Sequence, residues 1–97
     1  MEQRDYLIIL YDFYGELLSD DNKGYFEDYY FNNLSLSEIS ENIGISRNAV
    51  HKSIKLIEKK LLFYEENLSL YEKSIKLNNI IEKVKDKDIK EELERLL

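Results

Sequence analysis

The segment from Leu34 to Lys55 constrains the fold of this chain more than any other part of it. Its sequence, LSLSEISENIGISRNAVHKSIK, combines two stretches of helical apolar spacing with one glycine between them. Ser35 and Glu38 are spaced as in a capping box that begins a helix, and Ser46 is placed to cap a second helix. Gly44 supplies the positive φ that a chain needs when it reverses between two helices. The segment therefore predicts a helix-turn-helix.

Small or apolar residues stand at the positions around the turn that a helix-turn-helix packs inward. Relative to Gly44, positions −5, −4, −1, +1, +6 and +10 hold Ile39, Ser40, Ile43, Ile45, Val50 and Ile54. We expect these side chains to join the two helices.

Composition predicts one all-α domain over the 97 residues, with three glycines and no proline. Without cysteine there is no disulfide framework or thiolate site, and the single His51 cannot form a zinc site alone, so no metal or cofactor is expected. A reducing cytoplasm fits this composition. The chain begins MEQRD and lacks an apolar run of about 18 residues, so neither export nor a membrane span is expected.

The net charge of −6 is distributed unevenly along the chain. Residues 1–33 have eight acids and two bases, whereas residues 34–64 have three acids and five bases. Residues 65–97 have nine acids and seven bases. The only positive segment is therefore the one that contains the motif.

Two helices are expected before the motif, over residues 4–33. The first should span about Arg4 to Leu18 and bury one face, formed by Leu7, Leu10, Tyr11, Tyr14, Leu17 and Leu18. Ser19 is placed to cap the second, whose aromatic stripe is Tyr25, Phe26, Tyr29 and Tyr30. Asn32 and Asn33 should end it.

After the motif, apolar residues alternate at spacings of four and three, as in a heptad seam: Val50, Ile54, Ile57, Leu61, Tyr64, Leu68, Tyr71 and Ile75. We therefore expect the second motif helix to run through residue 75 or beyond, as an extension over residues 56–84. The polar run KDKD at 85–88 should end it. Asp88 and Glu91 predict a capping box for a short last helix over residues 86–97, with an apolar face of Ile89, Leu93, Leu96 and Leu97.

One face of the second motif helix is a candidate nucleic-acid site, formed by Arg47, Asn48, His51, Lys52 and Lys55. Arg pairs with guanine, Asn reaches adenine or phosphate, and lysines suit phosphate. The alternative is an ordinary solvated helix face. Lys59 and Lys60 either extend the phosphate contact or are ordinary surface lysines, and we favour the second interpretation. Catalysis has little support, because no nucleophile and base stand in a recognisable arrangement and the tail carboxylates alternate with lysines.

Three stretches, YDFY, EDYYFNNLSLSEI and ISRNAV, lie within a match from Tyr6 to Lys73 that resembles the YlxM-like family of small bacterial proteins. Their helix-turn-helix is similar to region 4 of sigma factors, and their genes usually stand beside that of the signal recognition particle protein. The resemblance implies a cytoplasmic, all-helical, DNA-binding regulator with a part in the signal recognition particle pathway. Two departures are Asp20 and Asp21 where the family tends to have basic and amide residues, and His51 and Lys52 where it often has Tyr and Asp.

The leading hypothesis is therefore a nucleic-acid-binding regulator, with DNA rather than RNA as target and signal recognition particle components as further partners. The rival hypothesis is an adaptor that binds a protein or ribonucleoprotein through the same fold, which the acidic residues 1–33 favour. An enzyme is a distant third.

The heptad seam also predicts a homodimer. Its distal part would form the contact, completed by the first and last helices, through Leu61, Tyr64, Leu68, Tyr71 and Ile75. Such a pair would present two recognition helices, as palindromic operators require. The alternative is a monomer in which the first helix or residues 77–84 cover the same stripe.

Overall fold

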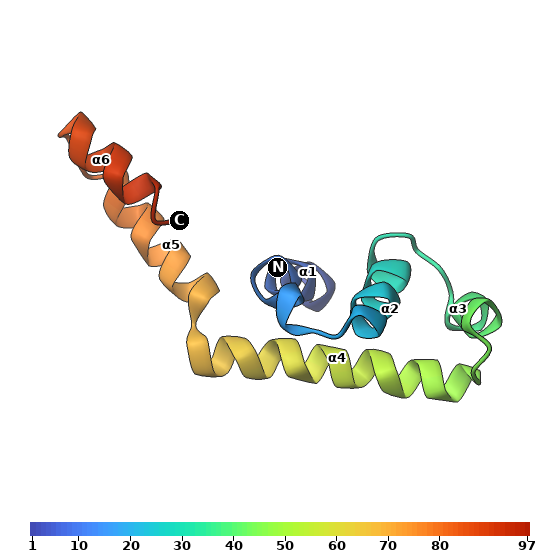
Figure 1. Cartoon of the computed structure of the whole chain (residues 1–97). Helices are drawn as coiled ribbons and strands as arrows, with labels where there is room; N and C mark the ends of the chain where they lie inside the picture. Colours follow the sequence, from blue (N-terminus) through green and yellow to red (C-terminus); the bar gives the residue numbers. More distant parts are fainter.

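The computed structural model describes all residues 1–97 and consists of helices joined by short connections. Their bounds are α1 Gln3–Tyr14, the 3₁₀ turn η1 Gly15–Leu17, α2 Asp20–Tyr30, α3 Leu36–Ile43, α4 Arg47–Leu68, α5 Leu70–Ile81 and α6 Lys87–Glu94. There is no strand, so the all-α prediction is confirmed. The helices α1, α2 and α3 pack along one side of α4, while α5 and α6 form an arm that projects from its far end (Figure 1).

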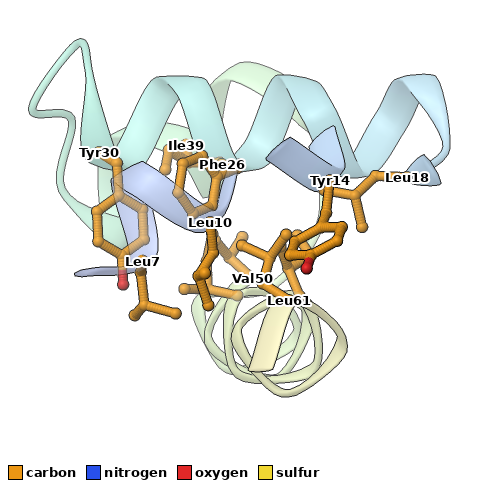
Figure 2. Close-up of a cluster of buried hydrophobic side chains, with 11 residues drawn as sticks. Leu7, Leu10, Tyr14, Leu18, Phe26, Tyr30, Ile39, Val50 and Leu61 are labelled. Carbon is orange, nitrogen blue, oxygen red and sulfur yellow. The ribbon is translucent and has the colours of Figure 1, made fainter. Parts of the chain in front are cut away.

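The core lies between the inner face of α4 and the first three helices (Figure 2). Its α4 residues are at most 2% exposed and follow the first half of the predicted seam: Val50, Ile54, Ile57 and Leu61. Opposite them lie the buried side chains of α1, α2, α3 and the connection after η1: Leu7, Leu10, Tyr14, Leu18, Phe26, Tyr30 and Ile39. Each buried Leu, Ile or Val contributes about 1.5–3 kcal/mol to the stability of the fold. This cluster therefore holds the two motif helices against α1 and α2.

The predicted helix starts before and within the motif are confirmed. The Ser19 hydroxyl accepts a hydrogen bond from the Asn22 N–H at 3.2 Å. Ser35 and Glu38 form the reciprocal capping box, with N–H···O distances of 3.1 and 3.0 Å. These bonds satisfy N–H groups that the first turn of a helix leaves free.

The prediction of one helix through residue 75 is wrong. The chain bends at Ser69, which has a φ of 54°, and α5 begins at Leu70. One side chain of α1 and one of α4 stabilise the bend. The Tyr14 hydroxyl of α1 accepts a hydrogen bond from the Leu70 N–H at 3.0 Å. The Glu65 carboxylate of α4 accepts hydrogen bonds from the N–H groups of Tyr71 and Glu72 at 3.1 Å each. These contacts cap α5 from outside its own helix, which the heptad pattern alone does not reveal.

The predicted seam is consequently divided. Leu61 is in the core, and the rings of Tyr64 and Tyr71 pack against α1, with centroids 5.8 Å from Tyr14 and 6.0 Å from Tyr6. Leu68 and Ile75 remain 44% and 43% exposed. Three of the five side chains expected to form a dimer are therefore covered by their own chain.

Two further expectations need correction. The first helix ends at Tyr14 and continues as the 3₁₀ turn, which leaves Leu17 56% exposed instead of buried. The last helix is capped by Asp86, whose carboxylate accepts from the Ile89 N–H at 3.1 Å, so the Asp88 and Glu91 box does not form. The expected apolar face of α6 is largely uncovered, since Ile89, Leu96 and Leu97 are 51%, 74% and 56% exposed.

The arm is supported by little packing of its own. Across α5 and α6 only Ile81 is buried. The molecule measures 56 × 24 × 23 Å, with the arm extending its long dimension. None of the helices combines the length with the apolar character that crossing a membrane requires.

Candidate nucleic-acid interface

The turn between α3 and α4 has the geometry of a helix-turn-helix. Gly44 ends α3 with a φ of 76°, in the left-handed region where glycine is favoured. The Ser40 hydroxyl donates to the Ile45 carbonyl at 2.5 Å, and the Ser46 hydroxyl accepts from the Ala49 N–H at 3.1 Å to begin α4. The turn is thus held by bonds that two serines make with its backbone.

Only part of the predicted inward set is buried. Ile39, Val50 and Ile54 are at most 2% exposed, as expected, whereas Ile43 and Ile45 are each 37% exposed. The helix α3 packs mainly against α2 and α4 at the end of the molecule, which leaves the turn largely uncovered (Figure 1).

The five predicted site residues all lie exposed on the first half of α4: Arg47, Asn48, His51, Lys52 and Lys55. From Arg47 to Lys55 the helix rises about 12 Å, at about 1.5 Å per residue. On the opposite side of the same turns, Val50 and Ile54 are buried in the core. The packing of α4 therefore directs this basic face away from the body.

The charge of this face is largely unpaired within the chain. Lys55 contacts the Glu58 carboxylate at 3.2 Å, whereas Arg47 and Lys52 have no carboxylate within 4.0 Å. Glu58 also accepts a hydrogen bond from the Tyr30 hydroxyl, so it is turned towards α2. The outer face of the first half of α4 consequently presents positive charge.

Tyr30 connects this part of α4 to α1 and α2. Its side chain is 7% exposed, and burial, followed by the hydrogen bond to Glu58, raises the pKa of its hydroxyl. The Arg4 guanidinium donates to the Tyr30 carbonyl at 2.6 Å and lies 4.9 Å from the centre of its ring. It also donates to the Asn33 side-chain oxygen at 3.1 Å, in the connection that leads to α3. These contacts fix the entry to the helix-turn-helix.

The whole chain, residues 1–97, matches the model of the UPF0122 family, described as "Putative helix-turn-helix protein, YlxM / p13 like". The chain belongs to this family. The resemblance found in its sequence is therefore confirmed, and the family description agrees with the motif at residues 34–55.

Relatives in several bacteria share this family. A UPF0122 protein of Caldanaerobacter subterraneus subsp. tengcongensis is 48% identical over 81 residues, covering 84% of this chain and 69% of the relative. One of Oceanobacillus iheyensis is 43% identical over 91 residues, covering 90% and 87%. One of Streptococcus pneumoniae is 37% identical over 101 aligned positions, covering 99% and 92%.

Two features escaped sequence reasoning. The first is Glu65, which was assigned no role from the sequence but is only 9% exposed and accepts a hydrogen bond from the Tyr14 hydroxyl at 2.6 Å. Its position four residues after Leu61 and three before Leu68 already places it on the inner face of α4. The second feature is a pair of apolar side chains outside the seam, Leu56 and Phe63, which are 57% and 54% exposed.

Proposed function

We propose that this protein is a nucleic-acid-binding helix-turn-helix regulator with DNA as its target. The observation that supports the proposal is the exposed basic and amide face of α4, which follows directly on the glycine turn. A recognition helix in this position enters the major groove with its N-terminal residues at the base edges. Family membership supports the same assignment.

The side chains divide into two roles by their chemistry. Arg47 and Asn48 stand in the first turn of α4, where they can reach base edges as a bidentate guanine contact and an adenine contact. Lys52 and Lys55 lie further along, where a cation neutralises phosphate without reading sequence. His51 lies between these two groups and is exposed.

Alanine substitution tests this division. Arg47→Ala should weaken binding to a selected duplex by about 1–3 kcal/mol and relax its sequence preference, whereas Lys52→Ala should weaken binding to all duplexes alike. Thermal stability should stay nearly unchanged because both side chains are exposed. Fluorescence anisotropy measures the affinities. A double variant that binds every DNA and RNA like the parent would show that this face does not contact nucleic acid.

We further propose a part for the protein in the signal recognition particle pathway, and therefore a cytoplasmic location. This step is supported by the YlxM-like resemblance alone. Affinity purification of the full chain from native lysate, analysed for both protein and RNA, tests it. Enrichment of signal recognition particle components above a charge-matched control supports the step, and their absence contradicts it.

A second candidate function is an adaptor that uses the fold to bind a protein or ribonucleoprotein. It is favoured by the acidic residues 1–33, whose net charge of −6 opposes a close approach of α1 and α2 to phosphate. Salt separates the candidates, because an adaptor held by apolar contacts loses little affinity as salt rises, whereas phosphate contacts lose much.

We also propose that two copies associate, with the surface shifted from the one expected from sequence. The exposed seam residues Leu68 and Ile75 adjoin an arm whose Leu70, Ile80 and Leu96 are also exposed. The surface area of 6886 Å² exceeds the roughly 5,900 Å² typical of a folded monomer of this mass by about 1,000 Å², and a standard interface needs about 800 Å² per partner.

The shape of the chain supports the same association. Its radius of gyration of 17.2 Å compares with about 12.5 Å for a compact chain of this length. Light scattering at micromolar concentration should give twice 11.7 kDa for the parent and a lower mass for Leu68→Glu. A monomer that persists on concentration contradicts the association and leaves the intramolecular alternative.

A further inference from the structure

We propose that the outer side of α4 between Leu56 and Phe63 is a docking groove for an acidic amphipathic helix of a partner protein. This groove lies beyond the residues assigned to nucleic acid, on the part of α4 that follows Lys55. The inference does not rest on nucleic-acid binding, and it gives the chain a second surface of different chemistry.

The groove is a surface hollow of about 360 Å³ on one helix. It is lined by Leu56, Lys59, Lys60, Phe63 and Tyr64. Leu56 and Phe63 are 57% and 54% exposed, although they belong to the same helix turns as the buried Ile57 and Leu61. All five lining residues belong to α4, and the helices α1, α2 and α3 pack against the inner face of α4, which holds Ile57 and Leu61 (Figure 1).

Positive charge surrounds these apolar side chains. Lys59 and Lys60 are exposed and have no carboxylate within 4.0 Å. The one acid of α4 before Glu65 is Glu58, whose carboxylate contacts Tyr30 and Lys55 and is therefore occupied. A partner must accordingly offer both apolar groups and carboxylates.

The spacing of the apolar side chains suits a helix. Leu56 and Phe63 are seven residues apart, which is about 10 Å along α4, or two helical turns. An amphipathic helix presents apolar anchors at the same interval, i and i+7, and lays them into a groove of this kind. Glutamates beside those anchors would then meet Lys59 and Lys60.

Nucleic acid fits this part of α4 less well than a protein helix. Leu and Phe side chains make no hydrogen bond to phosphate, and a phosphate backbone laid across them would lose hydration without a compensating contact. The two exposed apolar groups thus separate the groove from the face formed by Arg47, Asn48, His51, Lys52 and Lys55.

A peptide titration of the full chain tests the proposal. The probe is a synthetic helix of about 15 residues with Leu at i, i+4 and i+7 and Glu on both flanks, and the control peptide has Lys in place of each Glu. With ¹⁵N-labelled protein, the acidic peptide should shift the amide signals of Leu56, Lys59, Lys60 and Phe63 and bind with micromolar affinity. The basic peptide should bind about tenfold more weakly or not at all.

Variants localise the effect. Lys59→Glu with Lys60→Glu should weaken the acidic peptide about tenfold, and Leu56→Ser with Phe63→Ser should abolish its binding. Lys83→Glu with Lys85→Glu makes the same change of charge on exposed residues away from the groove, and should bind like the parent. Circular dichroism verifies that each variant is folded, which their exposure leads us to expect.

Three results would overturn the inference. The first is an acidic peptide that leaves the groove signals unshifted. The second is a loss of DNA or RNA affinity in the Lys59 and Lys60 variant while the peptide does not bind, which assigns the surface to nucleic acid. The third is a fall in the mass of the protein itself for the Leu56 and Phe63 variant, which assigns the surface to a second copy.

Discussion

Replacement of Glu65 by alanine should destabilise this protein more than any other single change to a charged side chain. The Glu65 carboxylate accepts hydrogen bonds from the Tyr14 hydroxyl at 2.6 Å and from the N–H groups of Tyr71 and Glu72 at 3.1 Å each. Oε1 accepts from the Tyr14 hydroxyl and the Tyr71 N–H, and Oε2 accepts from the Glu72 N–H, so the whole carboxylate is engaged. The variant therefore removes two hydrogen bonds that cap α5 and the hydrogen bond that joins α4 to α1.

The magnitude follows from the number and burial of these bonds. A hydrogen bond to a charged group contributes about 1.5–3 kcal/mol. The Tyr14 hydroxyl keeps the Leu70 N–H as a donor but loses its buried acceptor, whereas the two α5 N–H groups are partly buried and can recover water. The cost of burying a carboxylate without a cationic partner opposes this stabilisation. We expect a net loss of about 2–4 kcal/mol from the free energy of unfolding, and about half of that for Glu65→Gln.

Urea denaturation of the parent, Glu65→Ala and the matched control Glu66→Ala measures this loss. Glu66 is the exposed neighbour on the same helix and makes no hydrogen bond through its side chain, so its removal should change stability by less than about 0.5 kcal/mol. Amide exchange of Tyr71 and Glu72 should accelerate in the Glu65 variant only. Equal stability of the two variants would refute the account of the bend.

Three other predictions follow from particular residues. Gly44→Ala should lower the free energy of unfolding by about 1–2 kcal/mol, because the φ of 76° at this position disfavours a side chain. Gly24→Ala, within α2 and with open space around its Cβ, should raise it by about 0.5–1 kcal/mol. Thermal denaturation of both variants tests the contrast. Ile39→Asp should abolish cooperative unfolding, because Ile39 is 0% exposed and the charge would have no partner; retention of the parent's helical dichroism would contradict this. Burial, followed by the hydrogen bond to Glu65, raises the pKa of the Tyr14 hydroxyl from 10.0 to about 12. The contribution of the protonated hydroxyl to stability is therefore complete below pH 10 and is lost as the pH rises towards 12. Over that interval Tyr14→Phe should lose less of its free energy of unfolding than the parent.

Local sequence chemistry predicted the beginnings of the motif helices well. Ser35, Glu38, Gly44 and Ser46 act within a few residues of themselves, and their roles depend only on spacing and allowed φ. The inner face of α4 down to Leu61 also follows from its apolar period, because α1 to α3 cover it as one continuous surface.

The bend at Ser69 could not be predicted in the same way. The heptad spacing continues through it, and neither glycine nor proline marks it. It depends on Tyr14, which is 51 residues from Glu65 and meets it only in the folded chain. The division of the predicted dimer seam follows from this bend, since it turns α5 so that Tyr71 packs on α1 while Ile75 stays exposed.

The candidate site was predictable as a set of exposed side chains, because residues opposite a buried helix face must lie outward. Its function stays a prediction, since exposure is common to a recognition face and to an ordinary solvated surface. The exposure of Leu56 and Phe63 could not be predicted from the heptad spacing, because that spacing identifies only the apolar residues on the inner face of α4.

The salt dependence of DNA binding tests the central claim most directly. Anisotropy titrations of a labelled duplex across a range of salt should give a slope of log affinity against log salt of about −3 for the parent, as three or four phosphate contacts require. Lys52→Ala with Lys55→Ala should reduce its magnitude by about 2. A slope near zero, or one that the double variant leaves unchanged, would contradict the assignment of this face of α4 to nucleic acid.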